Sequence, residues 1–341
     1  MDASRRTRTL IVLALLIALA FVCVFLDLSW ISERKCYTFA EVWQALTGHG
    51  TWASETIVCE INAPRIVAGL FVGAGLAVTG AAMQAVFRNP LASPYILGLS
   101  SGASLGAAIG MLFTIPFIPS IIASPVLSFI TCFSTMVLVY AMSRAGGGVR
   151  TETLILSGVA VSSLLSALVS FLTFIAGDKL EGIVFWTMGN LGNADWSEIA
   201  LIAPVISVCS ILLVTQAKPL NAMMIGDAHA MDLGVDVRRT RLFVLILSTI
   251  VVASAVSFVG VIGFIGLVIP HILRILLGPD NRHIMPLSIV AGACFILICD
   301  YLAHIVAPTY GVLPIGVATS LIGAPVFIYL LIRRRREVGW N

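Results

Sequence analysis

The chain has 341 residues, of which 59% are hydrophobic and only 11% are charged. Soluble domains carry about 25% charged residues, so this composition excludes a soluble globular protein and indicates a polytopic membrane protein. A membrane-spanning helix needs roughly 20 apolar residues, and the length allows about ten such helices with short connections. The net charge of +3 argues against nucleic acid as a partner, and we expect the arginines to set membrane orientation instead.

The N-terminal segment has the charge pattern of a signal peptide. Arg5, Arg6 and Arg8 precede an apolar run over residues 10–26. However, no small-x-small cleavage site follows, and the run ends at Asp27 and then Trp30. We therefore predict a retained first span, anchored at the outer interface by the tryptophan.

Hydropathy and charge predict about ten membrane helices, which form a single transmembrane domain over residues 1–341. Cationic residues mark the N-terminus, every second loop and Arg333–Arg336, so we expect both termini in the cytoplasm and an even number of spans. The predicted fold class is an all-α polytopic membrane protein. The spans are placed near residues 10–28, 64–86, 95–113, 121–142, 152–176, 198–216, 241–259, 262–277, 284–302 and 312–332.

Residues 61–110 carry the strongest local signal. One run rich in glycine and alanine lies between Arg65 and Arg88, and a polar break with Asn89 and Pro90 precedes the next run. Small residues let membrane helices approach backbone to backbone. This pattern predicts two closely packed helices joined by an ordered loop.

Two segments are too polar to span a membrane. Residues 177–196 mix charge, glycine and tryptophan, which predicts a short helix and turn at the outer interface. Residues 220–241 have helical spacing but a polar residue in every turn, so we place them in the cytoplasm against membrane helices or a partner. The polar residues of this second segment include Asp227, His229, Asp232, Asp236, Arg238 and Arg239.

Site chemistry for an enzyme is weak in this sequence. The five histidines are scattered without HxxxH or HxxE spacing, no CxxC pair occurs, and there is no GxxxxGK[ST] phosphate loop. Secondary transporters hold an ionisable group at mid-membrane, whereas the acidic residues here sit at span ends (Asp27, Glu152, Asp178, Asp300). We therefore expect an external energy source, an ATPase that docks on residues 220–241.

Serines recur along the fifth predicted span at mostly helical intervals. Either they let helices pack closely, or they line a weakly polar translocation path. The candidate path-lining residues are Ser157, Ser162, Ser166 and Ser170.

Four motifs in order resemble the permease subunits of ABC importers for iron-siderophores, haem and vitamin B12. They are residues 61–110, then LILSGVA at 154–160 with WTMGNLGNADW at 186–196, then 257–282, and finally PIGVATSLIGAPVFIYLL at 314–331. The resemblance covers the chain from about residue 60 onward. It implies a homodimeric permease with a central path, two cytoplasmic ATPase subunits that bind the ATP, and an extracytoplasmic substrate-binding protein.

The resemblance also assigns roles to particular positions. The cytoplasmic gate falls on Asn89 and Leu91 and on Thr151 and Glu152, although Asn89 is equally suited to turning the chain before Pro90. Outer arginines of the family pair with glutamates of the binding protein. Arg65 matches one of them, Asn62 replaces a second, and His304 begins an altered stretch before the last span. The expected ATPase contacts are Leu220, Met224, Gly226, Asp227, Asp232 and Gly234.

Substrate and redox state stay open at this point. The resemblance favours an iron chelate, with haem or a corrinoid as alternatives and an ion-coupled secondary transporter as a distant one; no cofactor or metal is expected in this chain. Cys36 and Cys59 share the outer loop after the first span, so a disulfide is one possibility. Pairing requires Cα atoms within about 7 Å.

Overall fold

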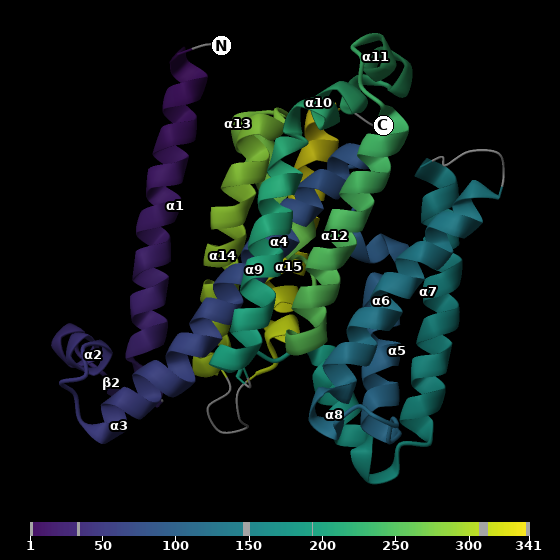
Figure 1. Cartoon of the computed structure of the whole chain (residues 1–341). Helices are drawn as coiled ribbons and strands as arrows, with labels where there is room; N and C mark the ends of the chain where they lie inside the picture. Colours follow the sequence, from purple (N-terminus) through teal and green to yellow (C-terminus); the bar gives the residue numbers. More distant parts are fainter. Residues whose placement is uncertain (1–2, 33–34, 146–150, 193, 307–312, 339–341) are drawn as a thin grey trace.

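The computed structural model describes residues 3–32, 35–145, 151–192, 194–306 and 313–338. Helices dominate this part of the chain, and the main ones run between its two ends (Figure 1). They are α1 (Ala3–Ser29), α4 (Ala63–Val86), α5 (Leu99–Leu112), α6 (Ser120–Arg144), α7 (Thr151–Phe174), α9 (Trp196–Thr215), α12 (Val237–Val259), α13 (Ile265–Leu277), α14 (Asn281–Val306) and α15 (Ile315–Val338).

Each predicted span coincides with one of these helices. Among the described residues, 7 helices are long and apolar enough to cross a membrane, whereas α5, α13 and the apolar part of α15 are shorter. The sequence-based spans were too long for α5 because Gly98 adopts a left-handed φ of 79° and separates it from the 3-10 turn η2 (Pro94–Leu97). The chain is thus an all-α, multi-pass membrane protein.

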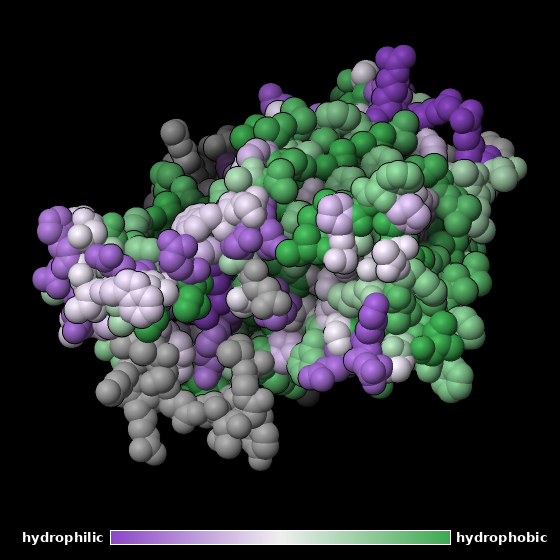
Figure 2. All heavy atoms as spheres, turned by 60° about the horizontal axis from the view of Figure 1, so that its bottom comes forward, coloured by the Kyte–Doolittle hydropathy of each residue, from purple (hydrophilic) through white to green (hydrophobic). Residues whose placement is uncertain are grey.

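The short elements lie at opposite ends of the bundle. The two chain ends lie at the top of Figure 1 together with α10 (Ala217–Ile225) and α11 (Asp227–Asp232). At the bottom lie α2 (Phe39–Leu46), α3 (Trp52–Glu55) and α8 (Leu180–Met188). Both chain ends thus lie at the same end of the bundle, as an even number of spans requires, and the cationic residues assign this end to the cytoplasm. In Figure 2, which brings the bottom forward, hydrophobic residues cover much of the surface, and hydrophilic residues gather at the left, with smaller groups at the upper right and lower centre.

Helix α4 is the centre of the bundle, and the most apolar stretch of the continuous helix Trp52–Val86 is 78% buried. Its glycines allow direct backbone contact with neighbours: a Cβ atom on Gly73 would overlap the carbonyl of Gly292 in α14, and one on Gly80 would overlap Gly266 in α13. The small residues of this block therefore allow close packing, as predicted, but the expected partner was wrong: α4 packs on α14 and α13, whereas α5 packs mainly on α6 and α7. At the edge of the bundle, only 6% of the residues in the most apolar stretch of α1 are buried, and the helix packs mainly on α14.

The outer loop after α1 is more structured than the sequence suggested. Two short strands, β1 (Trp30–Ser32) and β2 (Lys35–Cys36), pair antiparallel. Thr38 and Glu41 then form a capping box that starts α2, and a π-helical stretch η1 (Thr56–Asn62) leads into α4. The capping box explains the start of α2, and hydropathy does not register such local hydrogen bonds. Cys36 and Cys59 are free thiols in this arrangement, and the Cys59 thiol lies 3.5 Å from the Ala45 carbonyl oxygen.

Candidate functional site

The turn between α4 and η2 is ordered by its own hydrogen bonds. The Leu91 N–H donates to Asn89 Oδ1 at 2.9 Å, and the Asn89 N–H donates to the Gln84 carbonyl at 3.1 Å. Asn89 therefore turns the chain before Pro90, as one of the two interpretations predicted. Leu91 is 41% exposed. We call residues 88–93 the gate turn.

The other predicted gate residues begin α7. Thr151 is partly buried and Glu152 is exposed at its first turn. Further along α7, a Cβ atom on Gly158 would overlap the Ile96 carbonyl of η2, so α7 packs directly on the segment that follows the gate turn. Helix α7 thus packs on η2, the element that directly follows the gate turn.

One carboxylate connects the gate turn to the cytoplasmic segment. Asp227, the first residue of α11, forms ion pairs with Arg88 of the gate turn and with Arg241 of α12, the second at 2.9 Å. The Arg88 Nε–H also donates to the Met223 carbonyl at 2.6 Å. Asp227, which the family resemblance assigns to contact with the ATPase, therefore also connects elements within the chain.

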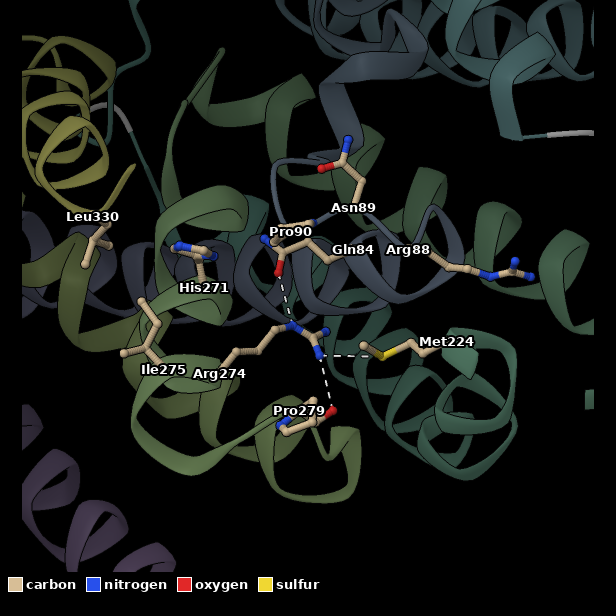
Figure 3. A pocket seen from close by; sticks show the side chains of 10 residues that line it. All are labelled: Gln84, Arg88, Asn89, Pro90, Met224, His271, Arg274, Ile275, Pro279 and Leu330. Carbon is tan, nitrogen blue, oxygen red and sulfur yellow. Dashed lines mark hydrogen bonds between the residues drawn. The ribbon is translucent and has the colours of Figure 1, made fainter. Parts of the chain in front are cut away.

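A cavity of about 480 Å³ opens beside this cluster, between α4, α10, α13 and α15. Figure 3 shows Arg274 at its centre, where the guanidinium donates to Gln84 Oε1 and the Pro279 carbonyl, both at 3.3 Å, and contacts Met224 Sδ. It also donates to the Ala81 carbonyl and to Asn281 Oδ1. All of these acceptors are neutral, so Arg274 connects α4, α10 and α14 by hydrogen bonding alone.

Helix α10 is also fastened to the loop between α13 and α14. Asn221 Nδ2–H donates to Asp280 Oδ1 at 2.6 Å, and the Asn281 N–H donates to Asn221 Oδ1 at 2.9 Å. Hydrogen bonds from the Arg282 side chain hold the pKa of Asp280 below its usual range. The carboxylate is therefore ionised at neutral pH and able to accept from Asn221.

The predicted coupling segment forms α10, α11 and the first turn of α12. Leu220 is fully buried and Met224 lines the cavity, so these two anchor the segment to the bundle. Asp232 and Gly234 are exposed, and a Cβ atom on Gly226 or Gly234 would meet open space. Three apolar side chains that were not predicted as contacts are also exposed here: Ile225 (71%), Met231 (59%) and Leu233 (62%). Their presence within a polar segment is the signal that could have found them.

The serines of α7 divide between two faces. Ser162 lies against Gly98, and Ser166 Oγ is 3.0 Å from Ser101 Oγ of α5, which supports the packing interpretation for both. Ser157 is partly buried, while the Ser170 hydroxyl donates to the Ser166 carbonyl within α7. A separate stripe with small residues at its centre is exposed along α7: Leu156, Ala160, Ser163, Ala167, Ser170 and Phe174.

Arg65 occupies a buried polar cluster at the outer ends of α4 and α14. Its Nε atom is 2.9 Å from Asp300 Oδ2, with side chains only 6% and 5% exposed, and its Nη1 atom is 2.7 Å from His304 Nε2. Asp27 of α1 is also buried. Arg65 is therefore buried, and its charge is neutralised inside the bundle. Docking of a binding protein would require an exposed side chain at this position. The docking role of Arg65 and His304 stays a prediction.

Comparisons with known proteins agree with this arrangement. Residues 8–333 match the FecCD transport family. The chain is 42% identical to the cobalamin import system permease protein BtuC of Halobacterium salinarum, over 84% of this chain and 75% of that protein. It is 40% identical to the hemin transport system permease protein HmuU of Yersinia pestis, over 88% and 89%. It is 36% identical to the Fe(3+) dicitrate transport system permease protein FecD of Escherichia coli, over 86% and 88%.

A solved structure shares the fold. It is described as a metal-chelate type ABC transporter in an inward-facing conformation, and it superposes with a TM-score of 0.84 at 30% identity, covering 95% of this chain and 99% of that one. The chain belongs to the FecCD transport family.

Proposed function

We propose that this chain is the membrane-spanning permease subunit of an ATP-driven ABC importer in the cytoplasmic membrane. The observation that carries the proposal is the match over nearly the full length to permeases named for cobalamin, hemin and ferric dicitrate import. The chain has no phosphate loop of its own, so ATP is bound and hydrolysed by a partner. The permease supplies the path and couples it to that partner.

The ATPase docks on α10 and α11. Ile225, Met231 and Leu233 expose apolar side chains at the cytoplasmic end. Exposed apolar patches of this kind mark sites of protein–protein contact. Open space around Gly226 and Gly234 lets a partner backbone approach closely. Two ATPase subunits serve two permease subunits.

The second permease subunit packs along α7. The exposed stripe from Leu156 to Phe174 has small or hydroxyl side chains at its centre, which suits close helix packing in lipid and a weakly polar path between subunits. The substrate is an iron chelate, with haem or a corrinoid as alternatives. An extracytoplasmic binding protein delivers it to the end that carries α2, α3 and α8.

Co-expression with candidate ABC ATPases from the same genome tests the proposal. Native mass spectrometry of the purified complex is expected to give two permease and two ATPase subunits. Ile225→Ser/Leu233→Ser should release the ATPase while the permease remains folded, whereas Leu10→Ser, an exposed residue on the outside of α1, should leave the complex intact. Titration of the binding protein with ferric dicitrate, hemin and cyanocobalamin then identifies the substrate class. A permease that never associates with an ATPase would contradict the proposal.

A further inference from the structure

Arg88 connects three elements at the cytoplasmic end of the bundle. Its backbone belongs to the gate turn, directly before Asn89 and Pro90, and its guanidinium reaches α10 and α11. In Figure 3 the guanidinium points away from the side chains at the centre of the cavity. We propose that Arg88 is a positioning residue that transmits displacement of α10 and α11 to the gate turn. This inference rests on the proposed function, since it assumes that an ATPase moves these two helices.

The contacts of Arg88 fall on both sides of the break between the two helices. Its Nε–H donates to the carbonyl of Met223, in the last turn of α10, and its terminal nitrogen pairs with Asp227, the first residue of α11. Gly226 separates α10 from α11 with an extended backbone. A guanidinium presents several donors in a fixed fork and can hold both acceptors at once. Arg88 therefore follows the joint between the helices and not one helix alone.

The gate turn is built to move with Arg88. The Arg88 backbone is left-handed, with a φ of 50°, and the next residues are stiffened by the Asn89–Leu91 hydrogen bond and by the proline ring. A shift of the Arg88 side chain therefore acts on a short rigid turn. A stiff turn moves as a unit, so a displacement of Arg88 also displaces Leu91 and η2.

The Asp227 carboxylate neutralises the charge of the arginine that connects the gate turn to α11. One of its oxygens pairs with Arg88 and the other with Arg241 of α12. The Arg241 side chain is 9% exposed, whereas those of Arg88 and Asp227 are 38% and 41% exposed. The buried partner fixes Asp227 against α12, and the more exposed partner is the one free to shift. An exposed pair contributes little to folding stability, so its loss should leave the fold intact.

A second set of hydrogen bonds holds α10 to the α13–α14 loop, so an effect on the gate turn can be distinguished from detachment of α10. Asn221 binds Asp280 and Asn281 independently of Arg88. Removing Arg88 is thus expected to leave α10 attached to the α13–α14 loop and available to the ATPase. Only the connection to the gate turn is lost. A residue with a merely structural role would loosen both.

Hydrogen–deuterium exchange of the full complex tests this. The permease, its ATPase and its binding protein are assembled in nanodiscs and compared without nucleotide and after trapping with ATP and vanadate. In the unsubstituted complex we expect a nucleotide-dependent change in peptides covering 220–234 and in peptides covering 88–93. In Arg88→Ala the change at 220–234 should persist, while that at 88–93 should shrink at least about twofold, the range of a moderate coupling loss. Arginine and alanine are both L-residues with a Cβ atom, so the cost of the left-handed backbone at position 88 is similar in the two proteins.

Two further variants complete the test. Arg144→Ala removes an exposed cation from the last turn of α6 at the same end and should leave both responses unchanged. Arg88→Lys should restore part of the response at 88–93, because an ammonium can hold the carboxylate but not both acceptors in the same geometry. A full response at 88–93 in Arg88→Ala would overturn the proposal alone. No response at 220–234 in the unsubstituted complex would contradict the proposed function and the relay together.

Discussion

The buried pair between Arg65 and Asp300 allows the clearest energetic prediction. The two side chains are 6% and 5% exposed and 2.9 Å apart, and His304 contacts the same guanidinium. Removing one partner of a buried ion pair leaves the other charge without compensation, which costs about 3–5 kcal/mol. We therefore expect Arg65→Met to lower the free energy of unfolding by about that amount. Methionine keeps most of the length and apolar stem of arginine, so packing loss contributes little.

The structure also supplies a matched control and a cycle. Arg239 pairs with Asp236 at 3.0 Å, but its side chain is 89% exposed, so Arg239→Met should cost no more than about 1 kcal/mol. The double variant Arg65→Met/Asp300→Leu should be less destabilised than the sum of its single variants, because no unpaired charge remains.

Unfolding with sodium dodecyl sulfate in mixed micelles, followed by circular dichroism, provides the free energies. If Arg65→Met were as mild as Arg239→Met, the buried-pair reasoning would be refuted. Loss of binding-protein capture with full stability would instead support the docking role that the family resemblance assigns to Arg65.

Three further predictions concern other parts of the chain. Gly73→Val should destabilise the bundle by about 1–3 kcal/mol or more, because its side chain would overlap the Gly292 carbonyl; the same unfolding assay measures it. Gly226→Trp should leave the permease folded, since open space surrounds this position, but uncouple ATP hydrolysis from transport; unchanged transport per ATP would show that the contact lies elsewhere. The hydrogen bonds from Thr38 lower the pKa of Glu41, so the capping box is stable above the unfolded pKa of about 4.3 and is lost as the pH falls through the lower folded value. Hydrogen exchange over α2 should therefore rise only below about pH 4, and Thr38→Ala should abolish that dependence.

The positions of the membrane helices could be predicted because the bilayer requires apolar spans, and because cationic residues concentrate in the cytoplasmic loops. Close packing along α4 was predictable from its small residues, but its partners were not, since Gly73 and Gly80 meet α14 and α13 and not the next helix along the chain. Span length was less so: the left-handed Gly98 shortens α5 without changing its hydropathy. The pairing of β1 with β2 depends on local hydrogen bonds that a window of apolar residues does not register.

The sequence identified candidate site residues but not the direction in which their side chains point or the partners that they bind. Arg65 sits at a span boundary, where an outward direction was the natural expectation, but its partner Asp300 is far away in the chain and pairwise distance is not encoded locally. The same holds for Arg88, whose acceptors lie in α10 and α11. Ser162 and Ser166 are one helical turn apart and share the α5 face. Helical spacing indicated that shared face, but which neighbour it meets required the tertiary fold.

The most direct test of the transport account is uptake into proteoliposomes that contain this chain, its ATPase and its binding protein. Uptake of ferric dicitrate, hemin or cyanocobalamin is measured with ATP, with a non-hydrolysable ATP analogue, and with a proton or sodium gradient alone. The account predicts uptake of one of these compounds only with hydrolysable ATP, and none by the permease without its ATPase. Accumulation driven by an ion gradient in liposomes that lack the ATPase would contradict it.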